Sequence, residues 1–402
     1  MLVIRVTYSL QVWWDRVRGS CGTRGALPPM GVLRAFSTLR ARSGRHAPAA
    51  ALLALSGLLL LLLAHWTPAA LSLSPVIVPL VHPNTNHTSK SMHSQLATEP
   101  RSLPPSATPD ASEKVARTTE EPLPAGAVRT RSRYVAGHTR AHAELCAARG
   151  ARLRLVVLVA SAPANAAARA AVRLTWGHAA RRADVALAFM LGAAPPDLRA
   201  QIDEEDALFG DLVEGRFVDS YLNLTLKTLS MLEWMETHCP LAPRLLKTDD
   251  DMFINVDGLL RFAEVGVRWG ANATVWGKVW RNGRPVRDPR SKFFVPLSEF
   301  PGKKYPAYAN GPAYLVTAAA ARRLRRAAGA APFLRMEDVF VTGVLAERAR
   351  VRRVDAPQFH NKVRQVQHAC ALRRALAVHQ VHYHEQFDLW RKLLDGKTKC
   401  PT

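Results

Sequence analysis

Arg152-Leu-Arg-Leu-Val-Val-Leu-Val-Ala160 is a short, continuous apolar run that follows a long polar stretch of the chain. A run of this length, rich in β-branched residues, predicts a strand buried on both faces of a parallel sheet. Helix-forming alanines follow from Ala166 to Trp176, and Gly177 marks the expected helix end. This change from strand to helix is the first sign of an α/β fold.

The alternation of strand and helix continues through the first half of this region. We expect strands at Val185–Leu191, Phe217–Asp219 and Arg244–Lys247, and helices at Pro195–Leu208 and Leu224–His238, the last of them amphipathic. Strands that alternate with helical segments form βαβ units. The sequence therefore predicts an α/β domain with a mostly parallel central sheet.

Three consecutive carboxylates, Asp249, Asp250 and Asp251, follow the fourth expected strand. In an open α/β sheet, ligands bind beyond the carboxyl ends of the strands. Three adjacent carboxylates repel one another unless a positive charge is near, and Mn²⁺ or Mg²⁺ would supply it while bridging to substrate phosphates. Two alternatives are an acidic helix N-terminus and an EF-hand loop, although Phe253 would occupy the first ligand position of that loop.

A second pair of carboxylates, Glu337 and Asp338, precedes an apolar run that is expected to open a helix. An Asp at this position often serves only as a helix cap. Inverting sugar transfer, however, needs one carboxylate to take the proton of the acceptor hydroxyl as its oxygen attacks the anomeric carbon. Because the acidic cluster accompanies it, we interpret Asp338 as this base.

The formal net charge of +23 would ordinarily suggest a nucleic-acid partner. The arginines are spread over the whole chain, and no zinc-knuckle, RNP or helix-turn-helix pattern accompanies them. We therefore predict no nucleic-acid binding. The charge is interpreted as a solvated surface that attracts acidic ligands such as nucleotide phosphates.

Residues 49–66 are apolar and include six consecutive leucines at 58–63. This length is close to a membrane span, and the arginines just before it predict an N-terminus that faces the cytosol. We expect a cytoplasmic tail at 1–48, a transmembrane signal-anchor at 49–66, a disordered stem rich in Pro, Ser and Thr at 67–145, and a lumenal domain at 146–402. A cleaved signal peptide ending near Ala70 is the alternative.

Sequons and cysteines agree with a lumenal body. Glycosylation is expected at Asn86, Asn223 and Asn272. Four cysteines follow the apolar segment, an even number that suits an oxidising compartment. Of their three possible pairings, we favour Cys146 with Cys239 and Cys370 with Cys400.

Taken together, these motifs resemble the β1,3-glycosyltransferase family of Golgi type II membrane proteins, which have a GT-A fold. The resemblance runs from about Leu153 to Leu394. It rests, in chain order, on Arg169-Ala-Ala-Val-Arg-Leu-Thr-Trp-Gly177, Met190-Leu-Gly192, Asp219-Ser-Tyr-Leu-Asn-Leu-Thr-Leu-Lys-Thr228, Lys247-Thr-Asp-Asp-Asp251, Tyr305-Pro-Ala-Tyr308 with Gly311, and Glu337-Asp-Val339.

The resemblance implies a GT-A-like domain that binds a UDP-sugar donor and a glycan acceptor on a glycoprotein or glycolipid. His379, eleven residues before Trp390, would join Asp251 as a ligand of Mn²⁺ or Mg²⁺. Asp338 would be the catalytic base. The expected donor side comprises Arg169, Arg173, Lys227, Asp249, Asp250 and Glu337. For Arg169 and Arg173, pairing with carboxylates is an equal alternative.

Two positions favour one branch of the family. Thr248 and Glu337 look like the galactosyltransferase branch, whereas the N-acetylglucosaminyl branch more often has Gly and Asp there. The run Asn310-Gly-Pro-Ala313 departs from the family's usual small residues. We therefore predict a UDP-galactose β1,3-galactosyltransferase of the Golgi membrane. The alternatives are a β1,3-N-acetylglucosaminyltransferase and an inactive lumenal binding protein on the same fold.

Overall fold

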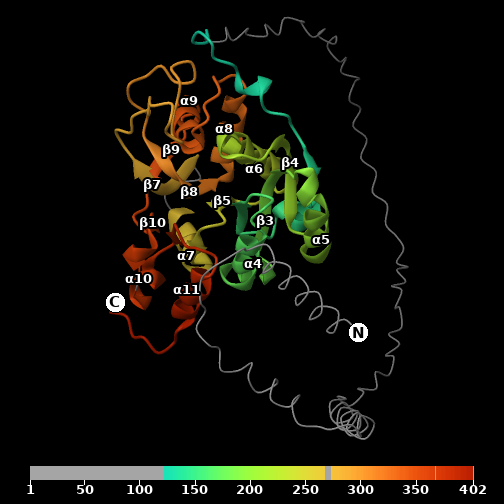
Figure 1. Cartoon of the computed structure of the whole chain (residues 1–402). Helices are drawn as coiled ribbons and strands as arrows, with labels where there is room; N and C mark the ends of the chain where they lie inside the picture. Colours follow the sequence, from blue (N-terminus) through green and yellow to red (C-terminus); the bar gives the residue numbers. More distant parts are fainter. Residues whose placement is uncertain (1–121, 268–272, 367, 402) are drawn as a thin grey trace, which may run out of the picture. The chain divides into compact units, whose positions relative to one another are not determined.

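An eight-stranded sheet in the order β1-β4-β3-β2-β5-β8-β7-β9 lies at the centre of the fold (Figure 1). The computed structural model describes residues 122–267, 273–366 and 368–401. The strands are β1 (His138–Arg140), β2 (Leu155–Ala160), β3 (Val185–Ala193), β4 (Leu212–Val218), β5 (Arg244–Asp249), β7 (Thr274–Trp280), β8 (Tyr308–Thr317) and β9 (Arg352–Asp355).

The strand directions divide the sheet into two parts. β4, β3, β2 and β5 are parallel, as the βαβ alternation predicts. β8 is antiparallel to both β5 and β7, and β1 is antiparallel to β4. β7 and β9 are parallel, so the sheet is mixed, with antiparallel pairs on both sides of the predicted parallel strands. The reason is that an irregular connection, not a crossover helix, leads from β7 into β8, and antiparallel neighbours need no crossover.

Helices cover both faces of the sheet (Figure 1). They are α4 (Ala166–Leu174), α5 (Arg199–Phe209), α6 (Leu224–His238), α7 (Val256–Val267), α8 (Ala318–Ala328), the π-helix η7 (Val339–Leu345), α9 (Ala346–Arg348), α10 (Ala369–Arg374) and α11 (Glu385–Leu394). Short 3₁₀ helices are η2 (Thr130–Ser132), η3 (Ala143–Gly150), η4 (Trp176–Arg181), η5 (Pro196–Leu198), η6 (Tyr221–Asn223) and η8 (Val363–Val366).

Strand β2 shows how the two faces are filled. Val156 and Leu158 belong to a core shared with α6 and α8, whereas Leu155 and Val157 belong to a core shared with α4 and α7. Side chains alternate across a strand, so a continuous apolar run is needed where both faces are buried. This is why the opening run of the sequence predicts the centre of the sheet correctly.

Helix α6 has the predicted bounds but a different environment. Every residue from Thr225 to Met235 is buried, so the expected amphipathic pattern is wrong. The segment 122–145 covers the outer side of this helix. Tyr134 donates a hydrogen bond from its hydroxyl to Glu233, and the backbone nitrogen of Gly137 lies 3.0 Å from the same carboxylate.

The folded domain begins earlier than predicted. β1 pairs with β4, with His138 opposite Gly215, although this strand falls within the stem expected at 67–145. The segment is polar in composition, and its order comes from tertiary contacts that composition does not reveal. The expected tail, the membrane segment at 49–66 and the first part of the stem lie outside the described residues. Among the residues that are described, no helix is long and apolar enough to cross a membrane.

A small second sheet brings two distant parts of the chain together. It consists of β6 (Phe253–Ile254), β10 (Phe359–His360) and β11 (Ala377–Val378), with β11 in the middle. Val378 lies opposite Phe253 in the antiparallel pairing of β11 with β6. This register places the residue after β11 beside the acidic cluster that precedes β6.

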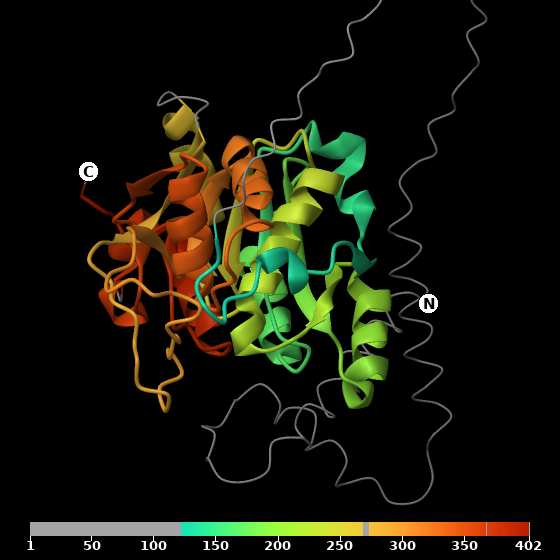
Figure 2. The same cartoon turned by 90° about the horizontal axis from the view of Figure 1, so that it is seen from above.

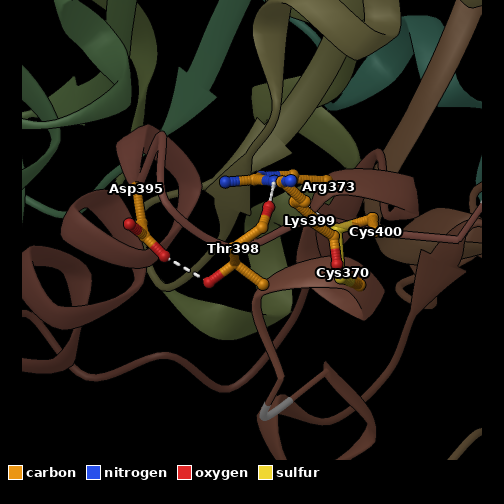
Figure 3. The surroundings of a disulfide bond; sticks show 6 residues. All are labelled: Cys370, Arg373, Asp395, Thr398, Lys399 and Cys400. Atoms are coloured by element: carbon orange, nitrogen blue, oxygen red, sulfur yellow. Dashed lines mark hydrogen bonds between the residues drawn. A yellow bond between two sulfur atoms is a disulfide. The ribbon is translucent and has the colours of Figure 1, made fainter.

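Two disulfides have the predicted pairing, Cys146 with Cys239 and Cys370 with Cys400. The second joins α10 to the C-terminal segment (Figure 3). Arg373 donates a hydrogen bond to the carbonyl oxygen of Thr398 at 2.6 Å, and the Thr398 hydroxyl donates to Asp395. The disulfide and these bonds hold the end of the chain against the helix that leads into β11.

Residues 281–307 connect β7 and β8 without a helix or strand and extend as a long gold-to-orange loop in Figure 2. Arg287 holds the loop by donating to the carbonyl oxygens of Val295 and Phe300, each at 2.6 Å. Arg335 donates to the Glu299 carboxylate at 2.6 Å. The loop is therefore fixed to the segment that immediately precedes Glu337.

Candidate active site

A cavity of about 860 Å³ lies at the carboxyl ends of the four parallel strands. The residues that follow β2, β3, β4 and β5 line one side of it, as expected for an open α/β sheet. Residues 310–312 at the start of β8 and residues 335–338 line the other side. Asp251 and Asp338 both line this one cavity.

The three consecutive carboxylates have three different partners. Asp249 accepts a hydrogen bond from the Lys247 ammonium at 2.5 Å. Asp250 accepts from the hydroxyl of Ser161 at 2.7 Å and from the side-chain amide of Asn165 at 2.9 Å. Burial raises the pKa of both Asp249 and Asp250, and the neighbouring Asp251 adds to this. Asp249 and Asp250 are adjacent in the sequence, but their carboxylates bond different partners.

The side chains of Asp251 and His379 lie close together, because the small sheet pairs β11 with β6. The Nε2 atom of His379 lies 3.2 Å from Oδ2 of Asp251. The backbone nitrogens of His379 and Val381 donate to the carbonyl oxygens of His360 and Asp251, at 2.9 and 3.0 Å, and so fix the two segments. The residue pair expected from the resemblance is therefore brought together in space.

This pair suits a divalent cation whose remaining ligands come from a substrate. A carboxylate oxygen and an imidazole nitrogen are both ligands that Mn²⁺ accepts. Within the described ranges, no group of three or more His, Cys, Asp or Glu side chains has a metal-binding arrangement. Asp251 and His379 would thus leave coordination positions open, which is how ions that bridge to phosphate oxygens are usually held.

Asp338 lies at the start of the π-helix η7 and is held by backbone donors. Its Oδ1 accepts from the nitrogen of Val339 at 2.8 Å, and its Oδ2 accepts from the nitrogen of Gly311 at 3.1 Å. Burial raises the pKa of Asp338, while these two hydrogen bonds and Lys247 oppose the rise. The cap interpretation and the base interpretation are both compatible with this geometry, because the side chain caps η7 and also faces the cavity.

Lys247 connects the acidic cluster to the candidate base. Besides contacting Asp249, its ammonium donates to the carbonyl oxygen of Gly311 at 2.8 Å. The nitrogen of the same Gly311 bonds Asp338. A side chain on Gly311 would enter this space, since a Cβ there would lie 3.3 Å from Glu337 and 3.4 Å from Asp338. The Asp249–Lys247–Gly311–Asp338 chain sets the spacing of the two carboxylate groups.

Glu337 lines the cavity but is only 6% exposed. It accepts a hydrogen bond from the Tyr314 hydroxyl at 2.6 Å, and its Oε2 lies 3.9 Å from the Lys247 ammonium. Burial raises the pKa of Glu337 to about 7, and the neighbouring Asp338 contributes to the rise. Glu337 is thus a buried support for the base rather than a residue that reaches freely into the cavity.

Arg169 and Arg173 pair with carboxylates, which is the second of the two alternatives. Arg169 is fully buried; it bonds Glu205 at 2.7 Å and the carbonyl oxygen of Ala162 at 2.6 Å. Arg173 bonds Asp211 and Glu205 at 2.6 and 2.7 Å. Neither side chain is among the described residues that line the cavity. Arg169 instead supports the cavity-lining loop that follows β2.

Lys227 does line the cavity, although its ammonium is already engaged. It bonds Asp219 at 2.9 Å and the carbonyl oxygen of Ser161 at 2.5 Å. Burial lowers the pKa of Lys227, against the opposing effect of Asp219. The residue therefore joins the ends of β2 and β4 beneath the expected donor side.

Of the three sequons, only Asn223 is described. It ends η6, and its side-chain amide donates to the carbonyl oxygen of Val218 at 2.9 Å. Asn86 and Asn272 lie outside the described residues.

Comparison with known proteins decides the family. The family model described as Galactosyltransferase matches residues 167–357. β-1,3-Galactosyltransferase 5 of Homo sapiens is 34% identical over 254 residues, which are 61% of this chain and 81% of that protein. The chain belongs to the β-1,3-galactosyltransferase family. It is accordingly a hexosyltransferase.

A second relative agrees with this membership. β-1,3-Galactosyltransferase 1 of Mus musculus is 32% identical over 246 residues, 60% of this chain and 74% of that protein. A solved structure of a galactosyltransferase in complex with donor and acceptor sugar analogues covers 58% of this chain and 94% of its own, at 11% identity and a TM-score of 0.31. That score is too low to carry an argument.

The sequence did not predict the roles of two residues in this candidate site, Lys247 and Gly311. Lys247 and Gly311 meet only because β5 pairs with β8, with Lys247 opposite Tyr314. One signal was available for the lysine. It stands two residues before Asp249 and directly after two leucines, and residues two apart in a strand share a face.

Proposed function

We propose that this family member transfers galactose from UDP-galactose to a sugar hydroxyl with inversion, forming a β1,3 linkage in glycoprotein or glycolipid glycosylation. The observation that carries the proposal is the position of Asp251 and Asp338 in one cavity at the strand ends. The names of the relatives support galactose and the β1,3 linkage, and Thr248 and Glu337 favour the same branch.

In this mechanism, Asp338 accepts the proton of the acceptor hydroxyl as that oxygen bonds to the anomeric carbon and the bond to UDP breaks. The hydrogen bonds from Val339 and Gly311 fix the carboxylate for this transfer. A carboxylate whose pKa is raised by burial is a better base than an ordinary one. No covalent enzyme intermediate is required, in keeping with a single base.

On the donor side, Asp249 and Asp250 would position the nucleotide sugar, and Asp251 and His379 would hold Mn²⁺ or Mg²⁺. A bound divalent cation would stabilise the negative charge of the departing diphosphate. Lys227 and Arg169 support this side from beneath, through the carbonyl oxygens of Ser161 and Ala162.

We test the proposal with the full chain, extracted in detergent and incubated with Mn²⁺ and a panel of UDP-sugars. We expect UDP release and a β1,3-linked product with UDP-galactose. Asp338→Asn should lower turnover at least about 100-fold, the lower end for loss of a general base. Asp251→Ala should also lower turnover, by removing a proposed metal ligand, and both variants should keep unfolding midpoints near wild type. Asp288→Asn, on the exposed loop, is the control.

Three results would change the proposal. Preferential use of UDP-N-acetylglucosamine would assign the chain to the sister branch. No turnover of any UDP-sugar in the presence of metal would favour an inactive lumenal binding protein. Normal turnover by Asp338→Asn would remove the base assignment.

We further propose that residues 49–66 anchor the chain in the Golgi membrane with its catalytic domain in the lumen. The apolar segment and the arginines before it support this orientation. In sealed microsomes, a protease added outside should shorten the chain only by its tail. Digestion of the catalytic domain without detergent would contradict the orientation.

A further inference from the structure

Two exposed aromatic residues stand at the mouth of the cavity. Tyr221 in η6 is 46% exposed and Phe293 in the 281–307 loop is 43% exposed, yet both line the cavity. Large aromatic side chains gain from burial, so two half-exposed rings at a cavity mouth indicate a surface that a ligand covers. None of the interactions derived above for the donor or the base uses these rings.

Lys292 lies between the two rings. Its ammonium is 4.9 Å from the centroid of the Phe293 ring and 5.9 Å from that of Tyr221, distances typical of cation–π contacts. It forms no ion pair with any carboxylate in the described part of the chain. The ammonium therefore contacts both the 281–307 loop and η6, and its N–H groups can donate hydrogen bonds to a ligand.

The position of this group is fixed by its surroundings. Arg287 holds the loop through the carbonyl oxygens of Val295 and Phe300, and Val295 itself is fully buried. The backbone nitrogen of Phe293 donates to the Ser291 hydroxyl at 3.2 Å. The Phe293 ring and the Lys292 ammonium are thus presented on a loop that packs against the domain, opposite Tyr221 of η6.

The loop that carries Lys292 and Phe293 belongs to the base side of the cavity. The loop is bonded to the segment before Glu337 through Arg335 and Glu299. Burial raises the pKa of Tyr221, and the negative charges of Asp338, Asp249 and Glu337 add to the rise, so the phenol lies within the field of the base. The substrate nearest the base is the sugar whose hydroxyl loses its proton.

We propose that Tyr221, Lys292 and Phe293 form the acceptor subsite, where the rings contact the apolar C–H face of a terminal pyranose and the ammonium donates hydrogen bonds to its hydroxyls. Aromatic rings offer broad apolar contact, while the cation fixes the orientation of a polar ligand. The subsite rests on the proposed function for its assignment to the acceptor. It determines which acceptor sugar reaches Asp338.

The test measures acceptor and donor constants separately on the full chain. Tyr221→Ala and Phe293→Ala should each raise the acceptor KM about tenfold, as loss of an aromatic contact does, and leave the KM for UDP-galactose within about twofold. Tyr221→Phe and Phe293→Tyr keep a ring and should raise the acceptor KM less than the alanine variants do. Trp280→Ala is the matched control, because Trp280 is 47% exposed but is not among the cavity-lining residues.

A binding measurement separates failure of this inference from failure of the proposed function. Saturation-transfer NMR with methyl β-galactoside and methyl β-N-acetylglucosaminide needs no turnover. If wild type transfers no galactose but binds one of these glycosides, and Tyr221→Ala loses that binding, the subsite stands and the proposed donor does not. An unchanged acceptor KM and unchanged glycoside binding in the Tyr221→Ala/Phe293→Ala double variant would overturn the subsite. A rise in the UDP-galactose KM alone would also overturn it, by assigning the rings to the donor.

Discussion

At the scale of single residues, the buried Glu337 makes stability depend on pH. Its pKa is raised from 4.5 to about 7 in the folded chain, so between these values the folded state retains a proton that the unfolded state has lost. Stability from this residue is therefore full below about pH 4.5, falls as pH rises toward 7, and then stays level. The rise in the pKa of Glu337 corresponds to a change of at most roughly 3 kcal/mol in the free energy of unfolding over this pH range.

Glu337→Gln removes this titration while keeping an oxygen that can accept from Tyr314. We expect the variant to lose less stability than wild type between pH 5 and pH 7.5, as measured by urea unfolding at several pH values. Parallel curves for the two proteins across this range would show that Glu337 does not titrate there.

Arg169 is a second residue whose burial makes it sensitive to substitution. It has no exposed surface and shares Glu205 with Arg173. Arg169→Met leaves a buried carboxylate with one partner fewer and should lower the free energy of unfolding by about 3–5 kcal/mol. Arg290→Met removes the ion pair between Asp288 and Arg290, a side chain that is 90% exposed. This substitution should change the free energy of unfolding by less than about 1 kcal/mol. Equal effects in a denaturant titration would contradict the supporting role of Arg169.

At the scale of elements, the sequence predicts what depends on local pattern. The apolar run 155–160 and the helix at 224–238 are where the pattern places them, and so is the acidic cluster after β5. The direction of β8 and the burial of α6 were not predictable, because both depend on partners far along the chain. In the candidate site, the carboxylates Asp251 and Asp338 could be predicted from their local motifs. The role of Lys247 could not be predicted, because it depends on the pairing of β5 with β8.

The Cys370–Cys400 disulfide holds an element that the proposed metal site needs. Cys370 is in α10, which leads directly into β11 and then His379. Removing this bond, which closes a separation of 30 residues, should cost about 3–4 kcal/mol in the chain-entropy account. With Cys370→Ser/Cys400→Ser, we expect a higher Mn²⁺ concentration for half-maximal turnover, because His379 is held less firmly.

The Cys146–Cys239 disulfide is the matched control for this element. It spans 93 residues and joins η3 to the end of α6, and neither cysteine lines the cavity. Its removal should lower stability by a similar or larger amount without changing the Mn²⁺ requirement. A higher Mn²⁺ requirement in both variants would show that general loosening, rather than the position of β11, is responsible.

At the scale of the whole molecule, the start of the folded domain is the feature that composition alone misplaced. A chain that begins at residue 143 lacks β1, so the edge of β4 loses its partner. It also lacks Tyr134 and Gly137, which bond Glu233, a carboxylate that is 7% exposed. Glu233 then keeps only Arg325 as a donor among the residues described. Because a buried carboxylate that loses most of its donors destabilises the fold by several kcal/mol, we expect the thermal midpoint to fall by roughly 5–10 °C.

A chain that begins at residue 116 retains all of these contacts and should melt with the full-length protein in a calorimetric scan. The comparison isolates residues 116–142, because both shortened chains lack everything before them and both keep the cavity. If the two shortened chains have the same thermal midpoint, β1 and its neighbouring residues do not stabilise the domain. If only the shorter chain melts early and loses turnover at 37 °C, residues 116–142 are part of the catalytic domain. The reason is that this segment covers the outer side of α6, and α6 carries Lys227 at the cavity.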